Sequence, residues 1–415
     1  MDLAERAIKA PCPRGGAMSE GDARGGMALG VSLNVLLLGL VSFITDVSSE
    51  MIHPVLPSFI EALGATALAV GLVGGVGDLM QNVLKAPSGY LSDRTGRRKA
   101  LTGAGYAISA VSKLFIPFSA SWAQVMALRA IERTGKGVRT APRDALIAES
   151  GGKRGRAFGI HRALDTLGAV VGSTTAFLLL LVAKLPLKDI MLYGALVAFG
   201  ALIPLIFVKE TARKRRARDT GGGRAKTAVP SALKKFLAVA TLFGLSNMTY
   251  MLFILYALTF VEPPLGLDPV VFATGLYVLF NVFYAGLSVP SGSLSDRIGR
   301  KKVIALGYAI FTLVCLGLMA ELSSPLVPIV VSLFCLYGAS TALIDGTQRA
   351  YASDLAPREA RGYALGIFHT SIGLASLASG LIAGAIWDFL SAWWAFAYAA
   401  ILSAISAVLI LALCE

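Results

Sequence analysis

One thirteen-residue segment occurs twice in the chain, and this repeat limits the possible folds more than any other feature. Residues 87–99 read PSGYLSDRTGRRK and residues 290–302 read PSGSLSDRIGRKK, with ten of the thirteen positions identical. The two copies lie 203 positions apart in a chain of 415 residues. Such spacing predicts that the chain consists of two copies of one structural unit. Each copy is short and basic and lies between long apolar segments.

Long apolar segments fill most of the chain. Of its residues 55% are apolar and 15% are charged, against roughly 25% charged in soluble domains. Apolar runs of about 18 residues or more can cross the hydrocarbon layer of a membrane as helices. A membrane barrel would instead show alternation in segments of about ten residues, so we predict an all-α membrane protein. Twelve transmembrane helices are predicted, at 28–60, 68–91, 100–118, 121–149, 157–183, 189–208, 236–260, 269–292, 303–321, 325–353, 362–386 and 391–413.

The basic residues are distributed unevenly between the predicted loops. The net charge is +13, and the loops on one side of the membrane contain 23 Lys or Arg. The loops on the other side contain only Lys184 and Lys188. Basic loops face the cytoplasm, so we predict a multi-pass protein of the cell membrane with both termini in the cytoplasm. Because topology explains the charge, nucleic acid is not an expected partner.

Two segments outside the predicted helices divide the chain. Residues 1–27 contain no apolar core, so they are predicted to be a disordered cytoplasmic tail and not a signal peptide. Residues 209–235 contain ten basic residues and three consecutive glycines, which is typical of a flexible cytoplasmic linker. The linker would separate an N-terminal helix bundle at 28–208 from a C-terminal bundle at 236–415. Binding of anionic lipid head groups is the alternative role for this linker.

Cysteine spacing and the absence of enzyme motifs limit the chemistry. Cys12, Cys315, Cys335 and Cys414 share no predicted outer loop and fit no metal-binding spacing. We therefore expect no disulfide, no metal site and no cofactor. The sequence contains no phosphate-binding loop, no HExxH and no Gly-x-Ser-x-Gly motif. We expect that the protein is not an enzyme and that an ion gradient supplies its energy.

The repeated segment carries a family resemblance. It resembles the signature loop of the major facilitator superfamily, Gly-x-x-x-Asp-Arg-x-Gly-Arg-Arg/Lys. The matching positions are Gly89, Asp93, Arg94, Gly96, Arg97 and Arg98 in the first copy and Gly292, Asp296, Arg297, Gly299, Arg300 and Lys301 in the second. A weaker repeat, RAFGIHR at 156–162 and RGYALGIFH at 361–369, extends the similarity of the two halves. The resemblance implies two six-helix bundles, related by a pseudo-two-fold axis along the membrane normal, that rock about a central site.

The motif residues are interpreted as a cytoplasmic gate. Gly89 and Gly292 would let two helices approach closely, and Gly96 and Gly299 would allow a tight turn. Asp93, at a helix end, would pair with a neighbouring arginine and hold the cytoplasmic side shut. Further gate residues, expected to pair with Asp93, are Arg139, Arg143 and Asp144. The alternative is that the second copy is only a basic turn that fixes the topology.

The first predicted span carries three ionisable residues. Asp46, Glu50 and His53 follow the spacing i, i+4, i+7, which places them on one face of a helix. Ionisable groups inside a membrane are costly and normally face a cavity or a partner. Two neighbouring carboxyls in such a site are suited to exchange a proton near neutral pH. The alternative is a structural ion pair, or a helix end wetted from outside.

Polar residues in later spans complete the candidate site. Asp78, Asn82 and Lys85 share one helix face, and Lys85 is expected to pair with Asp78 or with a carboxylate of span one. Arg129 lies where the resemblance places an intramembrane arginine, although the Glu-Arg pair at 132–133 replaces the usual Gln-Gly. Residues of the second half that are expected to shape the cavity are Asn247, Asn281 and Asp345.

Span five gives an indication of transport direction. Gly159, Gly168 and Gly172 match the start of the family's antiporter motif, but Ser173 replaces its proline. Exporters carry this motif more than importers do, so the partial match favours efflux. The glycines are expected to pack closely against the other bundle. A structural ion cluster is predicted at His161, Arg162 and Asp165.

The sequence therefore predicts a monomeric secondary transporter of small molecules. Proton-coupled efflux by antiport is the favoured mechanism, with the span-one carboxyls as proton carriers. The alternative is a divalent metal exporter with Asp46, Glu50 and His53 as ligands. A membrane receptor is disfavoured, because it would need an appended signalling domain.

Overall fold

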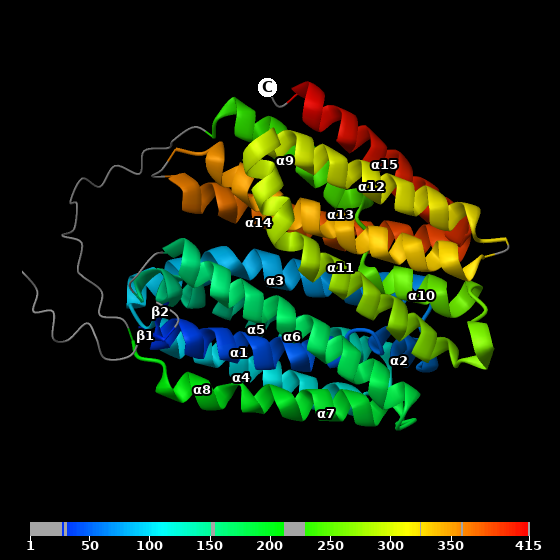
Figure 1. Cartoon of the computed structure of the whole chain (residues 1–415), viewed down its shortest axis with the longest axis horizontal. Helices are drawn as coiled ribbons and strands as arrows, with labels where there is room; N and C mark the ends of the chain where they lie inside the picture. The colour runs from blue at the N-terminus through cyan, green and yellow to red at the C-terminus, as the bar shows by residue number, and fades with distance from the viewer. Residues whose placement is uncertain are drawn as a thin grey trace, which may run out of the picture.

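The computed structural model is almost entirely helical (Figure 1). It describes residues 27–28, 31–150, 154–210, 229–323, 325–357 and 360–413. The predicted tail, apart from its last residue, and most of the predicted linker lie outside the described residues. Two strands of two residues, β1 (Met27–Ala28) and β2 (Val31–Ser32), pair antiparallel ahead of the first helix. The prediction of an all-α protein is confirmed.

The helices follow the predicted spans closely. Those of the first half are α1 (Leu33–Ile52), α2 (Leu56–Ala62), α3 (Ala67–Thr95), α4 (Arg98–Phe115), α5 (Trp122–Glu149), α6 (Arg154–Leu181), α7 (Leu187–Gly200) and α8 (Leu202–Phe207). Those of the second half are α9 (Ser231–Ser246), α10 (Tyr250–Phe260), α11 (Pro269–Ile298), α12 (Arg300–Ala320), α13 (Val327–Asp354), α14 (Arg361–Phe389) and α15 (Ala392–Leu413). Short 3-10 helices, η1 (Ile116–Phe118) and η2 (Pro264–Gly266), follow α4 and α10.

Helices long enough to cross a membrane occur throughout the described part of the chain. Among the described residues, eleven helical segments are long and apolar enough to cross a membrane. In that set α1 with α2, α7 with α8, and α9 with α10 each form one segment. The twelfth long helix, α5, is not in the set, and its many charged residues explain why. Its charge is an early indication that it faces something other than lipid.

The two halves of the chain form two layers that meet along α3 and α14. Figure 1 shows α1 and α4 to α8 on one side and α9, α12, α13 and α15 on the other. Helix α3 packs along α14, α6 packs along α11, and α10 contacts α2 and α3, so the interface contains helices of both halves along its length. This arrangement leaves a space between the halves that the site described below occupies.

The first span of each half is broken, although the sequence predicts one continuous helix in both places. Helix α1 ends at Ile52 and α2 begins at Leu56, and Pro54 lies in the break, where its ring prevents a regular helix. Helix α9 ends at Ser246 and α10 begins at Tyr250. No proline marks this second break. The side chain of Thr249 accepts a hydrogen bond from the start of α10 instead.

The repeated motif forms tighter turns than the predicted spans imply. Helix α3 continues to Thr95 and α11 continues to Ile298, so the loops shrink to one or two residues. Gly96 and Gly299 adopt φ values of 68° and 96°, which side chains with a Cβ rarely tolerate. The expected tight turns are therefore present. We call the end of the molecule that carries 93–99 and 296–302 the motif face, and the other end the opposite face.

Glycines bring α3 and α14 together near the opposite face. A Cβ atom on Gly71 would lie 2.2 Å from the carbonyl oxygen of Gly380, so the two backbones are in direct contact. Asp388, at the end of α14, accepts hydrogen bonds from the N–H groups of Ala67 at 3.0 Å and Leu68 at 2.9 Å. A carboxylate at a helix N-terminus satisfies otherwise unpaired N–H groups and interacts favourably with the helix dipole. These contacts close the opposite face.

The glycines of α6 pack within their own half, which corrects the prediction that they contact the other bundle. Cβ atoms on Gly168 and Gly172 would lie 2.5 Å and 2.4 Å from carbonyl oxygens of α1. Gly159 has no neighbour within 4 Å of such an atom. The close approach of α1 and α6 explains the glycines without reference to the direction of transport.

Stacked aromatic rings fill the core of the second half. The rings of Phe243 and Tyr308 lie 3.9 Å apart, and those of Phe253 and Tyr337 lie 4.3 Å apart. Phe311 packs edge-on against Phe243. Offset-stacked and edge-on ring pairs stabilise a core beyond the area that they bury, so these contacts help to hold the helices of the second half together.

Candidate functional site

A cavity of about 390 Å³ lies between the two halves. Its walls come from α1, α3, α5 and α6 of the first half and from α9 and α11 to α14 of the second. The volume suits a small molecule. Six residues that the sequence assigns to the transport site line it: Asp46, Asp78, Asn82, Lys85, Asn247 and Asp345.

The central cavity continues toward the motif face. A second cavity of about 840 Å³ shares Lys85, Thr140 and His369 with the first, and its other walls include Gly89 and Asp93 of the motif. The shared residues make the two cavities neighbours along one path. Because α10 contacts α2 and α3 near the opposite face, and Asp388 binds the start of α3 there, the central cavity is reached from the motif face.

A bridge of polar side chains crosses the cavity from one half to the other. Arg162 of α6 donates to Asp165 at 3.1 Å and to the hydroxyl of Tyr284 in α11 at 2.6 Å. Tyr284 donates in turn to Asp345 of α13 at 2.9 Å, and Arg349 donates to the same carboxylate oxygen at 2.7 Å. Arg162, predicted to belong to a structural cluster within α6, is therefore part of the cavity wall.

Asp46 pairs with a carboxyl that the sequence analysis did not assign to the site. Asp46 of α1 and Asp165 of α6 are within hydrogen-bonding reach of each other, and the Lys136 ammonium of α5 acts on both. A hydrogen bond between two carboxyl groups requires a proton on one of them, because ionised carboxylates only accept. This pair can therefore hold and release a proton at the wall of the cavity.

Glu50 and His53 lie in a separate network at the interface of the halves. Glu50 accepts hydrogen bonds from Tyr277 at 2.9 Å and from Asn281 at 3.1 Å, both in α11. His53 Nδ1 lies 3.0 Å from Glu50, and Arg133 lies 2.9 Å from His53 Nε2. Because an arginine can only donate, Nε2 accepts, and Nδ1 carries the proton that it donates to Glu50. Asn281, which was expected to shape the cavity, instead holds Glu50.

The Glu-Arg pair that replaces the family's Gln-Gly forms a buried cluster with Arg129. The Arg129 guanidinium donates to Glu132 at 2.9 Å, and the Arg133 guanidinium lies 3.3 Å from the same carboxylate oxygen. All three side chains are buried. Arg129 also contacts the Tyr250 hydroxyl of the second half at 3.4 Å. The single carboxylate of Glu132 thus pairs with two arginines of α5, next to the start of α10.

Lys85 has partners other than the predicted carboxylates. Its ammonium donates to the side-chain oxygen of Asn82 at 2.8 Å and lies 3.4 Å from His369 Nδ1 of α14. Asp78, the partner predicted from the helix face, interacts most strongly with the charges of Arg133 and Arg129 instead. Helix periodicity places residues on one face, but it does not say which side chains on that face touch.

Two predicted gate residues lie in the cavity wall. The Arg139 guanidinium packs 4.1 Å from the centre of the Tyr106 ring. Arg143 donates to Asp144 at 3.0 Å and to Ser42 at 3.1 Å. Both arginines line the central cavity, because α5 turns its charged face inward there.

The two motif copies form similar ion pairs with different arginines. In the first copy Arg98 pairs with Asp93 and with Glu149 at the end of α5. In the second copy the position equivalent to Arg97, Arg300, pairs with Asp296 at 3.2 Å and with Asp354 of α13. Helix α12 begins one position earlier than α4 in the aligned motifs, which turns a different arginine inward. Arg94, Arg97 and Arg297 are exposed.

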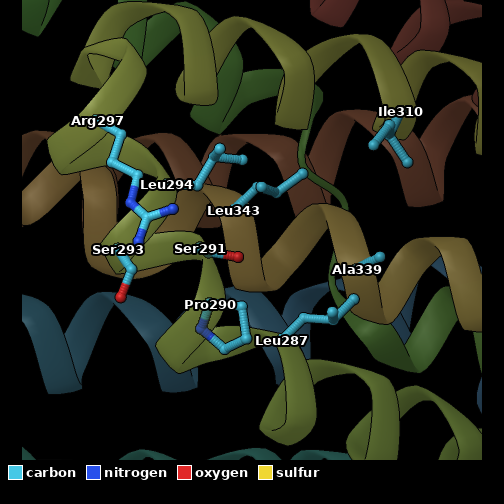
Figure 2. A pocket seen from close by; sticks show the side chains of 9 residues that line it. All are labelled: Leu287, Pro290, Ser291, Ser293, Leu294, Arg297, Ile310, Ala339 and Leu343. Carbon is cyan, nitrogen blue, oxygen red and sulfur yellow. The ribbon is translucent and has the colours of Figure 1, made fainter.

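The close approach expected at both motif glycines occurs at one of them. A Cβ atom on Gly89 would lie 3.3 Å from Ala141, whereas one on Gly292 would meet nothing within 4 Å. A pocket of about 530 Å³ lies beside the second copy (Figure 2). Figure 2 shows Arg297 and Ser293 at one side of it and Ile310 at the other. Its lining is largely apolar, so the central cavity is the stronger candidate site.

The residues of the metal-export alternative do not converge. Among the described residues, no group of three His, Cys, Asp or Glu side chains is placed to hold a metal ion. Glu50 and His53 bind each other, whereas Asp46 faces Asp165. Cys315 and Cys335 are free thiols in separate helices, and Cys12 and Cys414 lie outside the described residues.

Comparisons with known proteins agree with this architecture. The Major Facilitator Superfamily model matches residues 38–281 and 243–414. An uncharacterized MFS-type transporter of Methanocaldococcus jannaschii is 42% identical over 382 residues, which cover 92% of this chain and 95% of the relative. The inner membrane transport protein YajR of Escherichia coli is 26% identical over 88% of this chain and 78% of its own length. A crystal structure of a mutant nucleoside transporter NupG has a TM-score of 0.78 at 14% identity, covering 92% of this chain and all of that one.

Proposed function

The chain belongs to the major facilitator superfamily, and from this premise we propose that its central cavity carries a small solute across the membrane in steps coupled to protons. Membership of the family makes the protein a secondary transporter in a lipid bilayer. The coupling ion and the direction of transport belong to the proposal. Residues 28–208 would rock against 236–415, with 209–235 as the flexible connection between them.

The observation that carries the proposal is the carboxyl pair at the cavity wall. Asp46 and Asp165 come from two helices, α1 and α6, whose backbones approach each other closely at glycines. Lys136 and Arg162 supply positive charge beside the pair. A solute that enters the cavity alters the charge around these carboxyls, and a change in their charge alters the affinity for the solute. Such mutual influence is the thermodynamic requirement for coupled transport.

Glu50 supports the same proposal in a different way. Its carboxylate on α1 is held by Tyr277 and Asn281 on α11, so it joins the two halves. Separation of the halves at this level would leave the buried carboxylate with His53 but without its two donors from α11, which costs free energy unless water or a proton replaces them. We therefore propose that Glu50 contributes to the barrier between the two states of the transporter.

The prediction of efflux in exchange for protons was based on the glycines of α6. Gly168 and Gly172 pack on α1 within the same half, so their presence is explained without an antiport mechanism. We retain the proton as the coupling ion, and the direction of solute transport is to be determined by experiment. Divalent metal export, the alternative function, has no ligand cluster in the described residues.

We propose that the motif face is cytoplasmic and that the protein is a monomer in the cell membrane. The basic loops at 91–99 and 293–302 belong to that end of the molecule, and Glu210 accepts hydrogen bonds there from the backbone of Arg98 and Lys99. In this orientation the described state is open to the cytoplasm and closed to the outside.

The test is proton movement driven by solute in vesicles reconstituted with the purified full chain. A pH-sensitive dye inside the vesicles reports proton flux when solutes from a panel of organic anions, organic cations, sugars and nucleosides are added. Wild type is expected to move protons with at least one solute, and Asp46→Asn is expected to abolish that flux. The direction of the pH change distinguishes symport from antiport.

A matched control is Glu61→Gln, which removes an exposed carboxylate from α2 outside the cavity. This variant is expected to behave as wild type. Solute-driven proton flux of wild-type size in Asp46→Asn would contradict the assignment of Asp46 as a proton carrier.

A further inference from the structure

The two halves line the central cavity with different chemistry. Every lining residue from the first half is polar or charged. All the large apolar lining residues come from the second half: Phe243, Phe311, Ile344, Phe368 and Ile372. The cavity therefore has a wholly polar wall on one side and a mixed wall on the other, where these apolar side chains lie beside polar ones such as Asp345 and Arg349. A ligand that satisfies both walls must itself be amphipathic.

The charges that line the cavity are predominantly positive. The cationic side chains are Lys85, Lys136, Arg139, Arg143, Arg162 and Arg349, and the acidic ones are Asp46, Asp78, Asp165 and Asp345. Asp46 and Asp165 lie together on this wall, and the proton that we propose they share would remove one negative charge from this balance. Excess positive charge inside a membrane protein is costly unless a ligand or a partner neutralises it.

The acidic side chains of the wall already have cationic partners. Asp345 accepts from Arg349 and lies 3.6 Å from Arg162, and Arg162 also donates to Asp165. Asp78 interacts most strongly with two arginines of the buried cluster behind it. Arginines thus compensate Asp78, Asp165 and Asp345, and the charge of Lys136 acts on Asp46 and Asp165 without a direct ion pair.

Two lysines remain available for a ligand. Within the described part of the chain the Lys136 ammonium makes no hydrogen bond and no ion pair, although it belongs to the cavity wall. Lys85 contacts only neutral groups there, Asn82 and His369. The charges of Arg349 and Lys136 act on Lys85, and so do the opposite charges of Asp345 and Asp144. An ammonium has three donors, which leaves Lys136 able to bind an anionic group directly.

We propose that the central cavity binds an amphipathic organic anion, with its acidic head group between Lys136 and Lys85 and its apolar body against Phe243, Phe311 and Phe368. This inference rests on the proposed transport function and names its substrate class. A simple inorganic anion would leave the aromatic wall in contact with water. An organic cation would bring its charge against the unpaired lysines. A neutral sugar would satisfy neither wall.

The experiment compares four probes that share parts of one structure. Phenylpropionate, phenylpropylamine and phenylpropanol have the same body and differ in the head group, whereas propionate has the acid without the ring. Binding to the purified full chain is measured as a rise in melting temperature and by titration calorimetry, since a ligand that binds only the folded protein must stabilise it. Phenylpropionate is expected to bind at least about tenfold more tightly than the other three.

Variants of Lys136 connect this preference to the proposed site. Lys136→Gln is expected to weaken phenylpropionate binding about tenfold, as for one lost charge-assisted hydrogen bond. Lys136→Arg, which keeps the charge, is expected to retain most of the affinity. Lys188→Gln removes an exposed lysine on the opposite face and serves as the matched control.

The outcomes separate this inference from the proposed function. If phenylpropylamine or phenylpropanol binds as tightly as phenylpropionate, or if Lys136→Gln binds it as wild type does, the anion site is refuted. Proton flux driven by a cation or a neutral solute and lost in Asp46→Asn would then leave the transport proposal intact. Conversely, phenylpropionate binding that depends on Lys136, together with proton flux unchanged in Asp46→Asn, would support the anion site and refute the coupling residue.

Discussion

At the scale of single residues, Glu132 shows how a local departure from the family pattern is compensated. Its carboxylate lies between Arg129 and Arg133 in a fully buried position. Buried charges are tolerated only when they are paired and hydrogen-bonded. The replacement of Gln-Gly by Glu-Arg therefore adds a negative and a positive charge together, and the net charge of the cluster is the same as that of Arg129 alone.

Glu132→Gln is expected to destabilise the protein. Removal of one partner from a buried charge cluster leaves the two arginines without their direct ion pair and typically costs roughly 3–5 kcal/mol. The melting temperature of the purified variant should fall by several degrees. Glu262→Gln, at an exposed position after α10, controls for the loss of one carboxylate. Equal melting temperatures for Glu132→Gln and wild type would show that the cluster contributes nothing to the fold.

The sequence identified polar residues of the cavity but not their partners. Asp46, Asp78 and Lys85 were recognised because charge inside an apolar span has few structural roles. Their contacts depend on how helices from distant parts of the chain pack. Asp165 was interpreted as part of a local cluster, since its helix shows only the neighbours Arg162 and His161 and gives no sign of α1.

At the scale of elements, contacts of α10 with α2 and α3 join the contact of α3 with α14 in closing the opposite face. The Gly71 and Gly380 backbones touch near that face, and toward the motif face the same pair of helices lines a cavity. Close contact at glycines is a usual source of stability between helices in membranes, where lipid removes the hydrophobic driving force. The contact must break when the opposite face opens.

Gly380→Val is expected to shift the protein toward opening of the opposite face. Its Cβ would lie 2.2 Å from the Gly71 carbonyl oxygen, and a rigid backbone cannot yield to that contact without separation of the helices. Thr249→Cys, in a variant without native cysteines, reports the change, because Thr249 is buried beside α3 at this level. Labelling by a membrane-impermeant maleimide from the opposite face should increase.

Gly159→Val is the matched control, since its Cβ would meet no atom within 4 Å. It should label as the parent protein does. Unchanged labelling in a Gly380→Val protein that purifies with the same chromatographic profile would contradict the role of this contact.

The elements themselves were largely predictable, and their interruptions were not. Apolar length alone located the spans, because a membrane requires helices of about 20 residues. The break between α9 and α10 has no proline, and the segment 246–249 stops the helix only through its caps and its packing against α3. Likewise, two motif copies with ten identical positions use different arginines, because the start of the following helix differs.

At the scale of the whole molecule, the described structure represents one of two states. The halves touch near the opposite face and enclose a cavity that leads to the motif face. Transport by rocking requires a second state in which these relations are reversed. The bridge from Arg162 through Tyr284 to Asp345 crosses between the halves at the cavity, so it has to rearrange in that transition.

The most direct measurement is of distances between spin labels on the two halves at both faces. One pair at Arg94 and Lys302 reports the motif face, and one pair at Glu61 and Glu262 reports the opposite face; all four positions are exposed. Distances are measured with and without solute, in acidic and in alkaline buffer. If the halves rock about the central cavity, the population of molecules with a shorter distance at the motif face increases together with the population with a longer distance at the opposite face. Distances that change in the same sense at both faces, or that never change, would contradict alternating access about the central cavity.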